Sequence, residues 1–337
     1  MNRPRVIALT EVALFVLAGC SGAVIPSSTK PSVNMHAPAT SSEELFVAND
    51  KTVTVYAENG KLLRTISSAL NAPAALAIDA NRNLYVANRG NSTVTVYGAG
   101  STTLIRTIRS GVSQPRALAF DRQGNLYVGN KGDPTGNDAN GTVTVYAPGQ
   151  GLPARTIVHV DPHVLTFDRL DRLYVGNPGL NEILVYAPQR TTPNRIVHTH
   201  NGPLGINVGS NEFLYCVNNN SVTVYAPNAT HPTRRITNGI NLPSTLARFK
   251  NTLYVANWGV SPTQSSVTVY NLKNLALAQS IRFGIANPLA MAVDRTGELF
   301  VANNAYSTVT VYAAGKTRPS HTISTGIQGP VALAVAP

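Results

Sequence analysis

The sequence has few charged residues and few cysteines, and both shortages exclude whole classes of protein. Only 13% of the 337 residues are charged, and the two cysteines are Cys20 and Cys216. Two cysteines cannot supply the framework of a disulfide-stapled domain. The chain shows no Ser-His-Asp arrangement, no phosphate-binding glycine loop and no metal-ligand spacing. We therefore predict no catalytic residue, no metal and no cofactor.

Acidic residues are also scarce relative to basic ones. The chain holds 27 Lys and Arg against 16 Asp and Glu, which gives a formal net charge of +11. Such an excess is typical of proteins that bind nucleic acid or an anionic surface. The N-terminal segment predicts export, however, and the basic residues form no cluster in the sequence: five arginines recur at one repeat position, Arg64, Arg106, Arg155, Arg195 and Arg235. We therefore expect no nucleic-acid partner.

Residues 1–19 have the pattern of a signal peptide. Two arginines precede the apolar stretch Val6–Leu17, which is shorter than the ~20 apolar residues that span a bilayer. The stretch ends in Leu17–Cys20, which resembles the lipobox of bacterial lipoproteins. That resemblance implies a lipid on Cys20, a membrane as partner, and a place at the cell or outer membrane that faces the periplasm or exterior. An ordinary signal peptide that carries a cysteine is the alternative. Residues 20–42, rich in Ser, Thr, Pro and Ala, predict a flexible tether.

An internal repeat dominates the rest of the chain. Seven related motifs of the Leu-aromatic-Val-small-Asn kind follow one another at intervals of 39 to 47 residues, beginning at Leu45, Leu84, Leu126, Leu173, Leu214, Leu253 and Leu299. Around each motif lie a proline with an apolar segment, a Thr-Val-Thr-Val-Tyr segment and a short segment around Arg-Thr-Ile. Their alternation of side chains has the period of a β-strand. Four strands at this period predict an all-β, seven-bladed β-propeller of four-stranded blades over residues 43–337.

The order of the segments also predicts how the ring closes. The repeat begins with a second strand at Leu45 and ends with a surplus first strand over Pro330–Pro337. Pairing this C-terminal strand with the N-terminal blade completes the seventh blade and removes two open strand edges. We expect a monomer.

The segments Leu84–Asn88, Ser92–Tyr97 and Pro115–Asp121 resemble YVTN- and NHL-type propeller repeats of bacterial and archaeal envelope proteins. The resemblance covers about residues 43–337. It implies the propeller architecture and is silent on activity, because these repeats support many functions.

Most repeated side chains have a structural interpretation. Twelve of the 13 tyrosines fall on two repeat positions, which predicts packing. The seven asparagines that end the second strands are interpreted as turn caps, with a polar ring at the channel mouth as the alternative. The arginines before the fourth strands predict a charged outer rim that deters edge pairing, or else a basic belt toward anionic lipid or polysaccharide. Cys216 replaces a repeat valine and is expected to be a small buried side chain.

Residues that depart from the repeat are the candidate ligand-binding residues. Trp258 is the single tryptophan and Tyr306 the one tyrosine outside the repeat positions, and both fall in loops of adjacent blades. They predict an aromatic platform for a glycan, or else a cover over a blade junction. Such loops on a rigid ring are where binding residues concentrate. The polar insertion Lys131–Gly141 loosely resembles a calcium loop but lacks its spacing.

The histidines form the second group of candidates. His159 and His200 each lie three residues before a repeat proline, and His163, His198 and Asp161 are close to them in sequence. Histidine and aspartate together can hold zinc or act as a general base, or can be solvated loop residues.

Two functions fit these observations. The first is a lipid-anchored scaffold that binds a protein or glycan at the cell envelope. The alternative is a propeller enzyme of the lactonase or streptogramin-lyase type with a site at the channel mouth.

Overall fold

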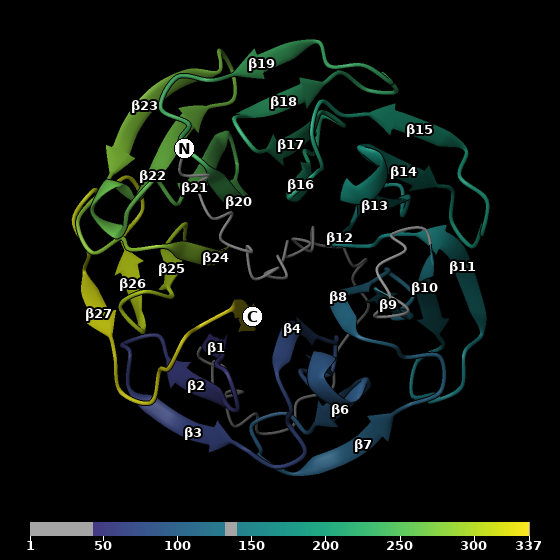
Figure 1. Cartoon of the computed structure of the whole chain (residues 1–337). Coiled ribbons are helices and arrows are strands. Elements are labelled where there is room, and N and C mark those ends of the chain that lie inside the picture. The colour runs from purple at the N-terminus through teal and green to yellow at the C-terminus, as the bar shows by residue number, and fades with distance from the viewer. Residues whose placement is uncertain (1–42, 132–139, 337) are drawn as a thin grey trace, which may run out of the picture.

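The computed structural model describes residues 43–131 and 140–336. The predicted signal peptide, the lipidation site Cys20, the tether and most of the insertion Lys131–Gly141 lie outside the described residues. Within the described residues, 28 strands form seven antiparallel sheets of four, arranged as blades around a central axis (Figure 1). The predicted seven-bladed β-propeller is confirmed.

Each blade is one sheet, whose strands follow one another from the inner edge to the outer edge. Blade 1 contains β28 (Ala332–Ala336), β1 (Glu44–Ala48), β2 (Val53–Ala57) and β3 (Leu62–Ile66). Blades 2 and 3 contain β4 (Pro73–Ile78), β5 (Leu84–Asn88), β6 (Thr93–Tyr97), β7 (Leu104–Ile108), and β8 (Pro115–Phe120), β9 (Leu126–Asn130), β10 (Gly141–Tyr146), β11 (Arg155–Val160). Blades 4 and 5 contain β12 (Val164–Phe167), β13 (Leu173–Asn177), β14 (Glu182–Tyr186), β15 (Arg195–His198), and β16 (Gly205–Val208), β17 (Leu214–Asn218), β18 (Ser221–Tyr225), β19 (Arg234–Ile236). Blades 6 and 7 contain β20 (Pro243–Phe249), β21 (Thr252–Asn257), β22 (Ser266–Asn271), β23 (Ala276–Ile281), and β24 (Pro288–Val293), β25 (Leu299–Asn303), β26 (Thr308–Tyr312), β27 (His321–Ile323).

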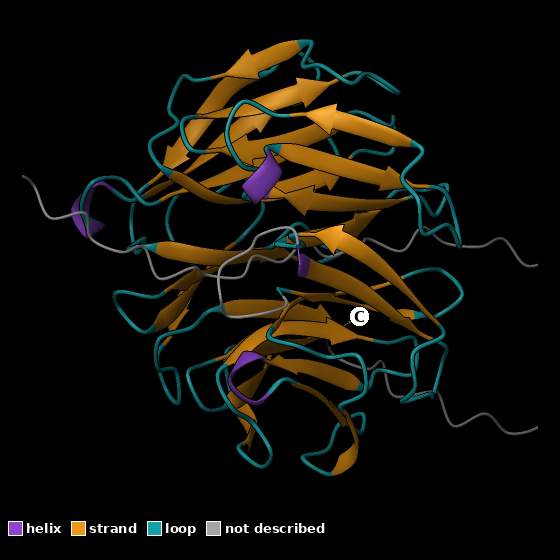
Figure 2. Ribbon diagram, turned by 45° about the vertical axis from the view of Figure 1, so that its right-hand side comes forward, coloured by secondary structure: helices purple, strands orange, loops and turns teal. Residues whose placement is uncertain are grey.

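Helical structure in the described part of the chain consists of short 3-10 turns, among them η1 (Arg89–Asn91), η3 (Pro178–Leu180) and η4 (Pro262–Gln264) (Figure 2). None of the helical segments described is long and apolar enough to cross a membrane.

The ring closes as the repeat order predicts. β28 pairs antiparallel with β1 from Glu44 opposite Ala336 to Ala48 opposite Ala332. The start of the described chain is also held by charge, because Arg64 donates to both carboxylate oxygens of Glu44 at 2.8 and 2.7 Å. Blade 1 therefore joins the two ends of the propeller in one sheet.

The core lies between the blades. Both faces of each blade pack against neighbouring blades, so the middle strands are buried along nearly their whole length, as β5 is from Leu84 to Asn88. β-branched and aromatic residues suit such surfaces. The twelve repeat tyrosines are all buried, which confirms their packing role.

A set of side-chain hydrogen bonds recurs beneath the connections between blades. The asparagine that ends the second strand is almost fully buried in each blade. In six blades its side-chain carbonyl accepts a backbone N–H from the connection that leads into that blade, as Asn88 does from Asn71 at 3.2 Å. In six blades its amide donates to a threonine of the third strand, as Asn88 does to Thr95 at 3.0 Å. The structure thus supports the structural interpretation of these asparagines.

The aspartates that recur at the end of the first strand, Asp79, Asp121, Asp168 and Asp294, form turns. Asp79 Oδ1 accepts the backbone N–H of Asn81 and of Asn83, both at 2.9 Å. Asp121, Asp168 and Asp294 make the same pair of bonds.

The propeller has two distinct faces. The turns between second and third strands meet the connections between blades, as shown by bonds from Trp258 N to Leu242 O at 3.0 Å and from Asn304 N to Asn287 O at 3.2 Å. We call this the upper face. The lower face holds the aspartate turns and the turns between third and fourth strands. The predicted ligand-binding residues outside the strands therefore belong to the upper face.

Candidate functional site

The connections between blades on the upper face follow one design with two exceptions. In five connections, six residues separate the isoleucine that ends the fourth strand from the proline that opens the next blade. From blade 3 to blade 4 only four residues lie between Ile157 and Pro162, and from blade 4 to blade 5 five lie between Val197 and Pro203. These two shortened connections contain the predicted residues His159, His198 and His200. The repeated hydrogen-bond pattern of the upper face is therefore altered at these two connections.

The hydrogen bond of the tyrosine that ends the third strand also differs at the shortest connection. In six blades its hydroxyl donates to a carbonyl of the preceding connection: Tyr56 to Thr325, Tyr97 to Ser68, Tyr146 to Ser110, Tyr225 to His198, Tyr270 to Asn238 and Tyr312 to Phe283. The remaining tyrosine, Tyr186, faces the shortest connection, and burial raises its pKa to about 12.

A compact polar cluster occupies the junction of blades 3 and 4. Asp161 and Arg116 are 3% and 4% exposed, and the half-buried ring of His163 lies between them. His163 Nε2 lies 3.7 Å from Asp161 Oδ1 and in hydrogen-bond contact with Arg116 Nη1. Asp161 Oδ2 also accepts the backbone N–H of Gly179 at 3.3 Å. The cluster combines a fixed donor, a fixed acceptor and an imidazole that can do either.

Arg116 was not among the site residues predicted from the sequence, although its position in the repeat distinguishes it. It follows the proline that opens the first strand, a position that blades 2, 5, 6, 7 and 1 fill with Ala74, Leu204, Ser244, Leu289 and Val331. A charged residue there is an outlier in the repeat. Because β8 and β12 are neighbouring inner strands, this outlier is brought next to His163.

The other predicted histidines lie apart from this cluster. His159 is exposed at a positive φ of 62° in β11. His198 is exposed, with Nδ1 3.7 Å from Glu182 Oε1 and its ring centroid 5.6 Å from that of His231. His200 is exposed in the connection that follows. Within the described residues, no group of three or more His, Cys, Asp or Glu side chains is placed to hold a metal ion.

The two predicted aromatic residues have different surroundings. Trp258 is half-buried, and its Nε1 donates to the carbonyl of Pro288, the first residue of β24, at 3.1 Å. The indole therefore spans the junction of blades 6 and 7. Tyr306, in the corresponding turn of blade 7, is 56% exposed. Their role in ligand binding stays a prediction.

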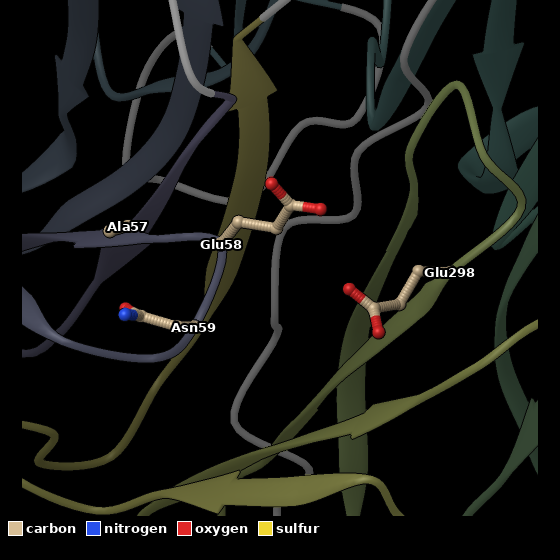
Figure 3. A pocket seen from close by; sticks show the side chains of 4 residues that line it. All are labelled: Ala57, Glu58, Asn59 and Glu298. Atoms are coloured by element: carbon tan, nitrogen blue, oxygen red, sulfur yellow. The ribbon is translucent and has the colours of Figure 1, made fainter.

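One cavity of about 460 Å³ opens on the lower face. Glu58 and Glu298 extend toward it from different blades, with Asn59 beside them (Figure 3). Burial raises the pKa of Glu298, and the nearby carboxylates of Asp294, Glu58 and Glu43 raise it further. These glutamates are far apart in the sequence and meet only because the ring closes.

A second hollow, of about 560 Å³, lies on the upper face between blades 1 and 2. It is lined by polar side chains and a leucine: Asp50, Lys51, Thr52, Ser67, Leu70 and Asn71, with Ala72. The turn of blade 1 is a two-residue turn closed by a bond from Asn49 N to Thr52 O at 2.8 Å. Blade 2 has the 3-10 turn η1 in the corresponding place.

Cys216 is fully buried in β17, and burial raises the pKa of its thiol to about 12. A protonated, inaccessible thiol is a packing group, as the repeat position predicts.

Comparison with known proteins gives a partial family match. The model of a family described as "Lactonase, 7-bladed beta-propeller" matches residues 46–150, which is about a third of the chain. The chain has no significant match among curated proteins.

Solved structures share the architecture. A functionally unknown protein from Desulfotomaculum acetoxidans DSM 771 superposes with a TM-score of 0.71 at 14% identity, over 88% of this chain and 99% of that one. Hydrazine synthase of Kuenenia stuttgartiensis has a TM-score of 0.62 at 20% identity, over 74% and 78%. The computationally designed Ika8 protein has a TM-score of 0.65 at 15% identity, over 88% of each chain. At these identities the likeness shows the fold alone.

Proposed function

We propose that this chain is an exported, lipid-anchored propeller that binds an envelope ligand, glycan or protein, on its upper face. The observation that carries the proposal is the cluster of Arg116, Asp161 and His163. It lies at the shortest connection between blades, where the repeat is broken. The repeated polar side chains, by contrast, make hydrogen bonds that stabilise the blades. Arg64 binds Glu44, and Arg195 donates to Tyr174 Oη at 3.1 Å.

The anchor rests on Leu17–Cys20, whose sequence favours lipidation. Acyl chains on Cys20, followed by a tether of polar and small residues, hold a rigid ring close to a membrane while leaving it free to turn. Ligands of such a protein are components of the envelope or of its surroundings.

A lactonase-type hydrolase is the second candidate, and the family match over residues 46–150 favours it. The same cluster supplies the required groups. Arg116 would donate to the carbonyl oxygen of a lactone, and His163 would take a proton from the attacking water and return it to the departing alkoxide as the ring ester bond breaks. Asp161, 3.7 Å from the imidazole, would stabilise its charged form.

The experiment that separates the two candidates compares the wild-type chain with Arg116→Met. Arrayed envelope glycans and proteins report binding, and base uptake at constant pH reports hydrolysis of aliphatic and sugar lactones. We expect binding that Arg116→Met weakens at least tenfold, and no turnover. Lactone hydrolysis that disappears in Arg116→Met would support the hydrolase instead. Lys316→Met, at an exposed site on the lower face, is the matched control and should leave both readouts unchanged.

A further inference from the structure

The aspartates and glutamates of the propeller are distributed unevenly around the ring. Residues 213–293, which cover most of blades 5 and 6, contain no acidic residue but six Lys and Arg. Beside this segment, Glu212 in the lower turn of blade 5 is paired with Arg169 and Arg172, at 2.5 and 3.0 Å. The charge of Glu212 is therefore neutralised within the fold, and the positive charge of blades 5 and 6 has no acidic residue to balance it.

The exposed cations of this part of the ring gather on the lower face. Those that make no ion pair with a described carboxylate lie in lower turns or at the lower ends of fourth strands: Arg190, Arg234, Arg235, Lys250 and Lys273. We call this set the basic sector. It spans blades 4, 5 and 6, which follow one another around the ring (Figure 1). On the upper face, the same described blades and their connections expose one Lys or Arg, Arg282.

The chain enters the propeller on this same side. Glu44 lies opposite Ala57, the last residue of β2 before the lower turn of blade 1. Arg295, in the lower turn of blade 7, donates to Glu43 Oε1 at 2.5 Å. A group attached to the residues that precede Glu43 is therefore linked to the lower face.

The proposed anchor makes the lower face the side that meets a membrane. A flexible linker with the length of residues 21–42 has an r.m.s. end-to-end distance of about 25 Å. A lipid on Cys20 therefore holds the lower face within a few Debye lengths, ~8 Å each, of the lipid headgroups. Such a linkage raises the effective concentration of the headgroups, so even weak contacts with them are populated.

We propose that the lower face docks on anionic phospholipid headgroups through the basic sector. The inference rests on the proposed function, from which it takes the anchor, and it adds an orientation: the upper face points away from the membrane, toward the ligand. Each Lys or Arg close to an anionic membrane surface strengthens binding about fivefold. The planar guanidinium groups of Arg190, Arg234 and Arg235 suit the paired oxygens of a phosphate.

Two observations favour a flat membrane surface over a single anionic chain. The basic sector is spread over the rim of three blades, and none of its residues lines either of the two hollows described above. Glu58, the exposed carboxylate among the described residues of the lower face, lies in blade 1, outside the three blades of the sector. The sector therefore approaches a negatively charged surface without a repelling carboxylate beside it.

The test places the full-length lipidated chain on vesicles of phosphatidylglycerol or of phosphatidylcholine. Hydrogen exchange in the lower turns, residues 189–192, 249–251 and 272–275, reports docking. At about 0.1 M salt we expect this exchange to be about fivefold slower on phosphatidylglycerol than on phosphatidylcholine, and at about 0.5 M salt we expect no difference, because salt screens surface charges. Exchange in the upper-face residues 199–202 and 259–264 should be the same on both kinds of vesicle.

The test variant combines Arg190→Gln, Lys250→Gln and Lys273→Gln. Losing three cations at about fivefold each should weaken docking about a hundredfold and remove the difference between the two kinds of vesicle. None of the three side chains makes a hydrogen bond or ion pair with a described residue, so the variant should melt like the wild type.

The matched control makes the same change in net charge on the upper face, with Lys51→Gln, Arg109→Gln and Arg282→Gln. These three side chains are also exposed. The control should dock like the wild type, because its substitutions lie on the face that points away from the membrane.

The inference is overturned if the lower turns exchange alike on both kinds of vesicle, or if the control variant loses docking as the test variant does. Slower exchange with soluble dextran sulfate but not with phosphatidylglycerol would indicate an anionic polysaccharide and would also overturn it. Sedimentation with the vesicles separates this result from the proposed function. A chain that sediments with phosphatidylcholine but docks on neither lipid keeps its anchor and loses the docking surface. A chain that sediments with phosphatidylglycerol alone, through the basic sector, keeps the docking surface and loses the anchor.

Discussion

Removing the last strand tests the closed ring most severely. Residues 330–337 supply β28, whose pairing with β1 completes blade 1. Leu333 and Val335 are 1% and 8% exposed, and the three alanines of the strand are equally buried. At about 1.5 to 3 kcal/mol for each large side chain and ~0.8 kcal/mol for each methyl group, their burial contributes roughly 5 to 8 kcal/mol. A typical domain is stable by about 5 to 15 kcal/mol, so the deletion should remove most or all of the folding free energy.

The assay compares the deletion of residues 330–337 with a milder pair of variants. Unfolding in urea is followed by circular dichroism, and light scattering reports aggregation from the exposed edge of β1. Leu333→Ala should cost about 2 to 5 kcal/mol, the range for buried leucines. Leu152→Ala is the matched control, since Leu152 is 73% exposed, and should change stability by less than about 0.5 kcal/mol.

A synthetic peptide of residues 329–337 provides an independent check. If β28 acts by pairing with β1, the peptide should restore soluble, folded protein when it is present during refolding of the truncated chain. A truncated protein that is soluble, monomeric and melts like the wild type would refute the closed-ring reasoning.

Three further predictions address the anchor, the closure and the core. Cys20→Ala should move the protein from the membrane fraction to the soluble fraction after a salt wash, because attachment depends on the acyl chains. The bonded Arg64 guanidinium lowers the pKa of Glu44, so this pair stabilises the fold above about pH 5, and its contribution is lost as the pH falls through the lowered pKa. Glu44→Gln should therefore cost about 1 to 2 kcal/mol in unfolding titrations at pH 7, and the difference from the wild type should shrink toward pH 3. Cys216 should not react with a thiol reagent at pH 8 until the protein is unfolded in urea, whereas a fast reaction in the native state would contradict its burial.

The architecture could be predicted from the sequence because the repeat encodes it locally. Alternating apolar residues mark each strand, a recurring Asp marks the lower turn of four blades, and the surplus strand at residues 330–337 marks the closure. Each of these features can be recognised from a short segment of sequence, without knowledge of contacts between distant residues. The structure confirms the seven blades, the four strands in each and the pairing at the seam.

The candidate site could be predicted only in part, because it depends on contacts between repeats. His163 stands out in the sequence, but its partner Arg116 lies in the preceding blade and is brought near by the packing of β8 against β12. The amide of Asn177 has no hydrogen-bond partner among the described residues, because blade 4 has Leu184 where the third strands of the other blades carry a threonine. Leu184 looks like an ordinary apolar residue until the hydrogen bonds of the other blades are known. Glu58 and Glu298 meet because the ring closes, which no local pattern reveals.

The central claim is that the upper face, at the shortened connections of blades 3 to 5, binds the ligand. Hydrogen exchange measured with and without a saturating concentration of the glycan or protein found to bind on the arrays tests it most directly, because backbone amides report where protection appears. The account predicts slower exchange over residues 158–164, 197–204 and 217–222 and unchanged exchange in the lower-face turns. Protection confined to the lower face, around residues 57–61 and 294–298, would contradict it.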